Sequence, residues 1–284
     1  MTALLQISDT HFGTEQPLVV EALLRLAHQL QPAVVILSGD ITQRARRAQF
    51  DAAREFAKRI STSALVAVPG NHDIPLFNVV ARLFYPYAGF ERAFGNNLEP
   101  EWRDSEVMVI CVNTTRASRH KDGEVSAEQI LRVSKRLATA TRRQLRIVVT
   151  HQPVHVLRSS EIHNRLHGHY EAIKVWSDAG ADIIMGGHIH LPYIAPLHEA
   201  YTDLSRRCWV VQAGTAVSTR VRARHPNSVN VITRADAKMA CAERWDYDAE
   251  LDRFHCVKSE QLNLDRGDGS GNFSAGGTFR DCGA

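Results

Sequence analysis

An apolar run, Ala64-Leu65-Val66-Ala67-Val68, is halted by Pro69-Gly70 and followed at once by Asn71-His72-Asp73. A short apolar run bounded in this way predicts a strand that ends in a tight turn, with the polar trio on the loop at its carboxyl end. The amide of Asn71 can offer a carbonyl oxygen to a metal, and the imidazole of His72 can carry a proton. One such loop is more often a plain turn. The prediction of a functional site here depends on four similar loops elsewhere in the chain.

Two of these loops precede it. A predicted strand at 4–7 leads into Asp9-Thr10-His11, and another at 33–37 leads into Gly39-Asp40, with amphipathic helices expected at 18–30 and 46–60. The interval from Asp9 to Asp40 is 31 positions, and the interval from Asp40 to Asn71 is 31 again. A strand-helix-strand unit takes about 30 residues and makes its strands parallel. All three loops are therefore expected at one edge of a sheet, where open α/β sheets bind ligands.

Further strands are expected at 107–112, 146–149 and 182–185, with helices from Ser126 to about residue 139 and at 171–179. The strand at 146–149 is followed by His151, and the strand at 182–185 by Gly187-His188-Ile189-His190. Beyond residue 205 the predicted strands, at 209–212, 229–233, 241–245 and 254–257, have no helices between them. This change predicts a second sheet packed against the first within one domain.

We therefore expect one domain over 1–264. Its segment 74–104 is rich in aromatic residues, and a helical excursion packed on the sheet is the favoured interpretation. The alternative is a lip beside the site or a dimer face. Residues 265–284 hold six Gly and no apolar run, so a disordered tail is expected.

The composition excludes little. With 34 Lys and Arg against 31 Asp and Glu, the net charge of +3 gives no strong sign of nucleic-acid binding. Cys111, Cys208, Cys241 and Cys256 lie in or beside apolar runs and are expected as reduced, packed thiols, since no two cysteines have C-x-x-C spacing. The chain has no transmembrane segment and no leader, which makes the cytoplasm the expected compartment.

The five loops together carry two carboxylates, one amide and four imidazoles that could bind metal: Asp9, His11, Asp40, Asn71, His151, His188 and His190. This set is too large for one tetrahedral zinc and too rich in nitrogen for calcium or magnesium alone. Divided between two metals that share a carboxylate, it fills both coordination shells. Metals about 3.5–4 Å apart can hold both the attacking and the leaving oxygen of a displacement at phosphorus.

The sequence resembles the calcineurin-like metallophosphoesterases over residues 4 to about 192. It carries five blocks typical of that family, in this order: D-x-H, G-D, G-N-H-D, H and G-H-x-H. The resemblance implies a four-layer α/β/β/α sandwich of two mixed sheets flanked by helices. It assigns one metal to Asp9, His11, Asp40 and His190, with Asp40 bridging to a second metal. It assigns that second metal to Asp40, Asn71, His151 and His188. The metals it implies are manganese, iron or zinc.

The resemblance also implies attack by a metal-bridging hydroxide, with His72 as the general acid and with Asn71 and His72 in contact with the substrate. We expect Asp73 to orient imidazoles rather than to bind metal. The histidines at 155, 163, 167 and 169 are expected on a mobile polar loop; alternatively, that loop uses Arg158 and Arg165 to touch a substrate. Gly267-x-Gly269-x-Gly271 follows no strand, so it is not a dinucleotide site.

The expected activity is hydrolysis of a phosphodiester. Similarity to the class III cyclic-nucleotide phosphodiesterases points to 3′,5′-cyclic AMP. Two other hydrolases remain open, one acting on a lipid-linked pyrophosphate such as a UDP-sugar lipid and the other a nuclease. An inactive protein-binding scaffold is the alternative from a different class. A homodimer is also left open.

Overall fold

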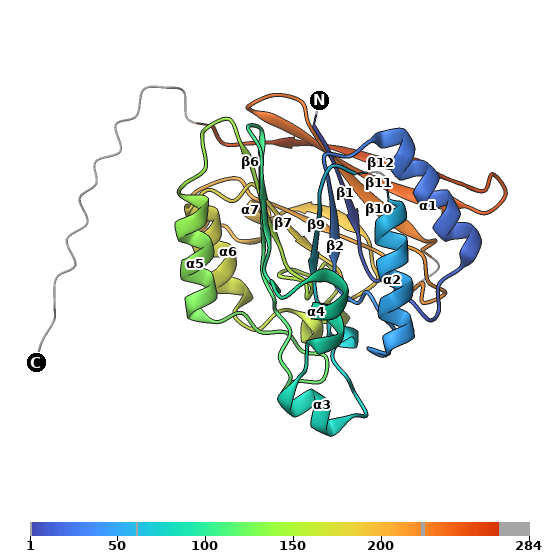
Figure 1. The fold of residues 1–284 in the computed structure, drawn as a ribbon. Helices are drawn as coiled ribbons and strands as arrows, with labels where there is room; N and C mark the ends of the chain where they lie inside the picture. The colour runs from blue at the N-terminus through green and yellow to red at the C-terminus, as the bar shows by residue number, and fades with distance from the viewer. Residues whose placement is uncertain (1, 61, 223–224, 267–284) are drawn as a thin grey trace, which may run out of the picture.

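The computed structural model describes residues 2–60, 62–222 and 225–266. Its centre is a pair of six-stranded sheets that face each other, with helices on both outer sides (Figure 1). This is the four-layer α/β/β/α sandwich of two mixed sheets that the resemblance implied.

The first sheet has the strand order β12-β11-β10-β1-β2-β3. Strands β1, β2 and β3 are parallel, while β10 runs antiparallel to β1 and begins an antiparallel extension through β11 and β12. The bounds are β1 Ala3–Ile7, β2 Val34–Ser38, β3 Leu65–Val68, β10 Ser228–Arg234, β11 Met239–Asp248 and β12 Arg253–Asn263.

The second sheet has the order β4-β5-β6-β7-β9-β8. Its strands β5, β6, β7 and β9 are parallel, and short antiparallel strands close both edges. The bounds are β4 Glu101–Arg103, β5 Val107–Cys111, β6 Leu145–Val149, β7 Ile183–Gly186, β8 Tyr193–Pro196 and β9 Trp209–Gln212.

The expectation that the strands beyond residue 205 form the second sheet was wrong. Of those strands only β9 joins it, and the strands from the middle of the chain make up the rest. Strands β10, β11 and β12 instead extend the first sheet from β1. The sequence pattern could not reveal this, because any apolar strand can pair with the free side of β1, and periodicity does not specify the partner.

The helices cover the outer faces of the two sheets. Helices α1 and α2 lie on the first sheet, and α5 and α6 lie on the second (Figure 1). Pro17 begins α1, where its missing N–H costs nothing, and the Ser126 hydroxyl accepts a hydrogen bond from the Gln129 N–H at the start of α5. The bounds are α1 Pro17–Leu30, α2 Arg47–Arg59, α5 Ala127–Leu137, α6 His169–Asp178 and α7 Leu197–Ala200.

Successive side chains along a strand point to opposite faces of its sheet, and they form three apolar cores. Leu5 and Ile7 of β1 point towards α1 and α2, while Leu4 joins the apolar layer between the sheets. The third core lies between the second sheet and α5 and α6, around the fully buried Trp176. Burying a side chain of this size typically contributes several kcal/mol, so the three layers hold the strand ends in fixed positions.

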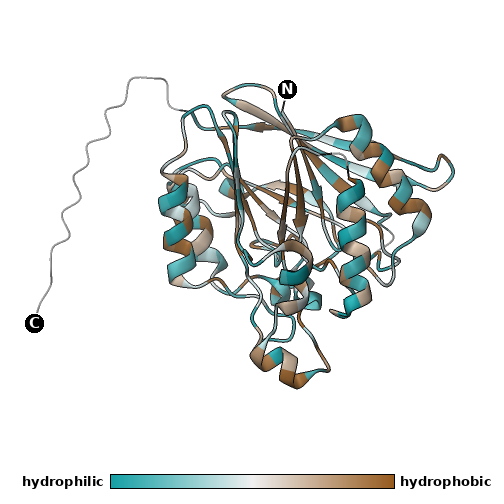
Figure 2. Ribbon diagram, viewed as in Figure 1, coloured by the Kyte–Doolittle hydropathy of each residue, from teal (hydrophilic) through white to brown (hydrophobic). Residues whose placement is uncertain are grey.

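The 74–104 segment forms two short helices, α3 Val79–Phe84 and α4 Ala88–Phe94. Helix α4 packs through the buried Phe90, as the helical-excursion interpretation predicted. Helix α3 does not, because none of its residues is buried. It projects from the edge of the molecule at which β1, β2 and β3 end, and Figure 2 shows its apolar character.

The four cysteines among the described residues are free thiols. Cys111 and Cys208 are buried and Cys241 is partly exposed, but Cys256 is exposed, so the expectation of a packed thiol was wrong there. The predicted tail at 265–284 falls outside the described residues except for its first two residues, and all six of its glycines lie in the undescribed part. Within the described residues, no helix combines the length and the apolar character that a membrane crossing requires.

Candidate metal centre

Five loops at the carboxyl ends of strands from both sheets meet at one place. Asp9 and His11 follow β1, Asp40 follows β2, and Asn71 opens a single 3-10 turn, Asn71–Asp73, after β3. From the second sheet, His151 follows β6, and His188 and His190 follow β7. The structure brings all seven predicted metal-binding side chains together, because the two sheets face each other with these ends on the same side.

A first group consists of Asp9, His11, Asp40 and His190, whose ligand atoms all lie within 4.8 Å of one another. The Nε2 atom of His190 is 3.2 Å from Oδ1 of Asp9 and 3.2 Å from Nε2 of His11. All four residues are buried. Two imidazole nitrogens and two carboxylates directed at one point form a donor set suited to a transition metal.

A second group consists of Asp40, His151 and His188, again with ligand atoms within 4.8 Å of one another. The side-chain oxygen of Asn71 lies 3.0 Å from Nδ1 of His188 and 3.3 Å from Nε2 of His151. The distance from Nε2 of His151 to Oδ1 of Asp40 is 3.2 Å. Asp40 belongs to both groups, so its carboxylate lies where it could join two ions.

Backbone carbonyls fix two of the imidazoles. Nδ1 of His151 donates to the carbonyl of Ser38 at 2.9 Å, and Nδ1 of His190 donates to the carbonyl of Arg220 at 2.6 Å. Each bond places the proton on Nδ1 and leaves the lone pair of Nε2 directed into the centre. This is the tautomer that metal binding requires.

The backbone at the centre is strained. Five of the seven residues have positive φ: Asp9 at 53°, His11 at 42°, Asp40 at 48°, His188 at 71° and His190 at 57°. A non-glycine residue in this region costs about 1–3 kcal/mol, and such strain is concentrated at functional sites. The packed sheets hold these loops in conformations that the residues would not adopt on their own.

Gly70 permits the close approach of two loops. A Cβ atom at this position would collide with the backbone nitrogen and Oδ1 of Asp40. The loop after β3 can therefore lie against the loop after β2 only because residue 70 has no side chain. This contact brings Asn71 beside Asp40.

The buried charges shift one another's pKa values. Burial alone would raise the pKa of the Asp9 carboxyl, but the nearby His190 outweighs it and lowers that pKa to about 2. For Asp40, burial is likewise outweighed by His151, and its pKa lies well below the usual range. Burial lowers the pKa of His11 and of His188 to about 3 in each case. Both carboxylates are thus ionised near neutral pH, and these two imidazoles are neutral with lone pairs available to a cation.

His151 and His190 show the opposite shift. Burial would lower the pKa of His151, but the charge of Asp40 raises it to about 9. Burial also disfavours protonated His190, yet Asp9 raises its pKa above the usual value. The buried carboxylates thus favour a positive charge on these two imidazoles in the metal-free protein, and bound cations would supply that charge in its place. The donor atoms, their burial and their charge thus fit a pair of metal ions.

His72 lies beside the centre without joining either group. Its Nδ1 donates to the carbonyl of Gln43 at 2.8 Å, and its backbone N–H donates to Oδ1 of Asp40 at 2.8 Å. Its Nε2 accepts a hydrogen bond from Nη1 of Arg220 at 3.3 Å. The Gln43 carbonyl therefore fixes the ring through Nδ1, and Nε2 points away from that carbonyl.

The expectation that Asp73 orients imidazoles was wrong. Its carboxylate accepts hydrogen bonds from the backbone N–H groups of Ile41, Thr42 and Gly70 and from the Thr42 hydroxyl. Burial and the nearby Asp40 raise its pKa to about 6. Asp73 therefore joins the loops after β2 and β3 through their backbones and acts on the centre only through loop position.

A crevice of about 210 Å³ opens above the centre. Several of its residues belong to no predicted motif, namely His120, Lys121, Asn164, Arg220 and Arg222. The rest of its lining is Asp40, Asn71, His72, His188, Ile189 and His190. Arg220 and Arg222 lie soon after the loop that follows β9, and this position is the only sequence signal that they belong to the site. Their spacing matches no functional motif.

The polar loop after β6 contains a short helix and several hydrogen bonds. Residues Ser159–Asn164 form a 3-10 helix, and His155 and His169 hydrogen-bond to Tyr201 and to the carbonyl of Leu166. Glu161 in this helix is buried and binds Arg222. Of the residues in this loop, Asn164 lines the crevice, whereas Arg158 and Arg165 do not.

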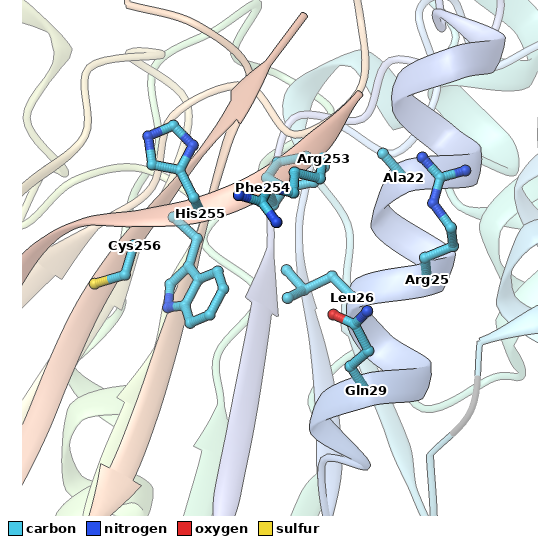
Figure 3. A pocket seen from close by; sticks show the side chains of 9 residues that line it. Ala22, Arg25, Leu26, Gln29, Arg253, Phe254, His255 and Cys256 are labelled. Carbon is cyan, nitrogen blue, oxygen red and sulfur yellow. The ribbon is translucent and has the colours of Figure 1, made fainter. Parts of the chain in front are cut away.

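A larger pocket, of about 300 Å³, lies between α1 and β12 (Figure 3). Arg25, Leu26 and Gln29 reach into it from α1, and Phe254, His255 and Cys256 line it from β12. None of its residues belongs to the five loops. Despite its size it has no carboxylate among its lining residues, so we assign the candidate site by its donor atoms rather than by volume.

Comparison with known proteins gives a consistent result. The family model of the calcineurin-like phosphoesterases matches residues 2–192, well over half of the chain. No curated protein matches the sequence. Among solved structures, a purple acid phosphatase from yellow lupin seeds superposes with a TM-score of 0.69 at 15% identity, covering 93% of this chain and 54% of the lupin chain. This chain thus spans about half the length of that protein.

A dimetal phosphatase from Danio rerio superposes with a TM-score of 0.65 at 13% identity, covering 93% of this chain and 99% of that one. At such low identity the two structures establish the shared fold. The family model, whose match includes all five loops of the centre, establishes more. The chain belongs to the calcineurin-like phosphoesterase family.

Proposed function

We propose that this protein hydrolyses a phosphodiester with the help of two metal ions. The observation that carries the proposal is the pair of donor groups that share Asp40 beneath an open crevice. We assign Asp9, His11, Asp40 and His190 to one ion, and Asp40, Asn71, His151 and His188 to the other. Manganese, iron and zinc all accept this mixture of nitrogen and oxygen ligands. Such a pair supplies Lewis-acid activation of the phosphoryl group and of a water molecule.

His72 is the proposed general acid. The Gln43 carbonyl holds its Nδ1–H, so the ring can present Nε2 to the crevice. Once Nε2 has taken up a proton from solvent, it can deliver that proton to the leaving oxygen and return to the neutral ring. Proton transfer from a positioned side chain contributes typically 10²- to 10⁴-fold to a rate. Asn71 and His72 line the crevice and are the proposed contacts to the substrate.

The first candidate substrate is 3′,5′-cyclic AMP. This narrower proposal rests on the resemblance of the five sequence blocks, and of the Gly214-Thr215-Ala216 loop after β9, to the class III cyclic-nucleotide phosphodiesterases. It is an argument by analogy at the level of the family.

A second candidate is favoured by helix α3. Phe77, Val80, Leu83 and Phe84 are each at least 65% exposed, and the neighbouring Ile74 and Leu76 line a small pocket together with His72. Exposed apolar side chains beside a reactive centre suit a substrate with an apolar leaving group. A lipid-linked pyrophosphate, such as a UDP-sugar lipid, has this character.

The test is a panel of phosphoesters assayed with Mn²⁺. We expect hydrolysis of an aryl phosphodiester, and a loss in kcat of roughly 10²- to 10⁴-fold in His72→Ala with metal content unchanged. A matched control is His28→Ala, since His28 is exposed on α1 and outside the crevice. A fully metallated protein without activity on any ester would contradict the proposal and favour a binding scaffold.

The same panel separates the two substrate classes. Cyclic AMP should be hydrolysed in plain buffer. A lipid-linked pyrophosphate would require detergent, and Leu83→Ser would raise its KM. Activity on the lipid substrate alone would replace the cyclic-nucleotide proposal.

A further inference from the structure

Arg220 lies in the connection between β9 and β10 and supports the centre through its main chain. Its carbonyl accepts hydrogen bonds from Nδ1 of His190 at 2.6 Å and from the Thr215 hydroxyl at 3.0 Å. The residue is therefore held in place by its backbone, whatever its side chain does. A substitution that keeps the backbone leaves the support of His190 intact.

The side chain of Arg220 reaches residues on the loops that follow β2 and β3. Its Nη1 donates to Nε2 of His72 at 3.3 Å and to Oε1 of Gln43 at 3.1 Å. Both acceptors are uncharged when His72 carries its single proton on Nδ1. The guanidinium thus covers the atom from which the proposed proton transfer starts.

The charge of Arg220 has no carboxylate partner among the described residues, whose ion pairs do not include it. Arg222, two residues further on and lining the same crevice, differs in this respect. Its guanidinium donates to both carboxylate oxygens of the buried Glu161, at 2.6 and 3.0 Å. Of these two neighbouring arginines, only Arg220 has its positive charge free for an incoming anion.

A phosphate group that enters the crevice changes the position of lowest energy for this guanidinium. The leaving oxygen needs the place beside Nε2 of His72, which the Arg220 guanidinium occupies in this structure. A guanidinium binds phosphate oxygens through two parallel N–H donors, more strongly than it binds neutral acceptors.

We propose that Arg220 is a substrate-binding residue that moves from His72 and Gln43 onto a non-bridging oxygen of the phosphate. This inference rests on the proposed function, because it assumes that the phosphoester enters this crevice. Arg220 then has two effects. Its guanidinium binds the phosphate, and its departure from Nε2 allows His72 to face the leaving oxygen.

The experiment measures binding of inorganic phosphate to the Mn²⁺-loaded protein by titration calorimetry, with metal content determined for every sample. The variants are Arg220→Gln, which removes the charge, and Arg220→Lys, which keeps the charge without the two-donor geometry. The control is Arg25→Gln, since Arg25 is exposed on α1 and pairs with Asp252 far from the loops. We expect phosphate affinity to fall roughly 10- to 100-fold in Arg220→Gln, less in Arg220→Lys and not at all in the control.

Three results would overturn the inference. Phosphate affinity in Arg220→Gln could stay within twofold of the wild type, or the wild type could fail to bind phosphate. Loss of metal from Arg220→Gln would instead make the side chain a structural support. Failure of this inference can be distinguished from failure of the proposed function. A protein that is inactive on all esters could still show the difference in phosphate affinity between the wild type and Arg220→Gln. On an active protein, the arginine variants should raise KM for the ester, whereas His72→Ala lowers kcat.

Discussion

The change Asp40→Asn tests whether one carboxylate serves both ions. Asparagine keeps the shape of the side chain and an oxygen that can accept the His72 N–H, now 2.8 Å from Oδ1, but it removes the negative charge. Because Asp40 belongs to both donor groups, this single substitution should weaken both sites. Asp9→Asn changes a residue of one group and should weaken only that site.

The magnitude follows from linkage. A ligand present at 100 times its dissociation constant stabilises the folded state by about 2.7 kcal/mol per site, so two sites contribute about 5 kcal/mol. In a chain of this size about 1 kcal/mol shifts the melting temperature by roughly 2–4 °C. Metal should therefore raise the Tm of the wild type by roughly 10–20 °C, that of Asp9→Asn by about half as much, and that of Asp40→Asn by very little.

The assay is differential scanning calorimetry with and without Mn²⁺, together with metal analysis of the dialysed protein. Asp203→Asn is the matched control, since Asp203 is an exposed partner of Lys174 outside the centre. The reasoning is refuted if Asp40→Asn retains as large a metal-dependent shift as Asp9→Asn, because Asp40 would then not be shared.

Three further predictions concern the loops, the charges and the core. Gly70→Ala should abolish metal binding and activity, because its Cβ would push the Asn71 loop off Asp40; normal metal content by elemental analysis would contradict this. In the metal-free protein, the lowered pKa of His11 and His188, about 3 in each case, means that their contribution to stability is present above pH 6.5 and is lost as the pH falls towards 3. The raised pKa of His151, about 9, means that its contribution is present below pH 6.5 and is lost as the pH rises through 9. Urea unfolding across this range should show both losses, and His151→Asn should remove much of the alkaline one. Trp176→Ala should cost about 3–5 kcal/mol of stability by the same urea assay, with metal content kept in the folded protein; a cost below 1 kcal/mol would show that the second sheet and its helices do not depend on this core.

The sequence predicted the loops of the centre well, for a physical reason. Parallel strands with crossover helices put their carboxyl ends at one edge, so the equal spacing of Asp9, Asp40 and Asn71 already placed them near one another. His151, His188 and His190 follow parallel strands of the other sheet, and the way the sheets face each other brings them to the same place.

Other features depend on long-range packing and could not be predicted. The pairing of β10 with β1 is a choice among many apolar strands, and it determines where the connection from β9, with Arg220, must pass. Asp73 looked like a partner for imidazoles from its place beside His72, but only the structure shows that three backbone N–H groups surround it. The aromatic-rich composition of the segment 74–104 favours packing on the sheet for the whole segment, and it does not separate the exposed α3 from the packed α4.

The most direct test is a crystal structure of the Mn²⁺-loaded protein with anomalous diffraction measured to locate the metal. The predicted result is two peaks about 3.5–4 Å apart, with the carboxylate of Asp40 between them, His11 and His190 at one peak and His151 and His188 at the other. A single peak, or two peaks away from Asp40, would contradict it.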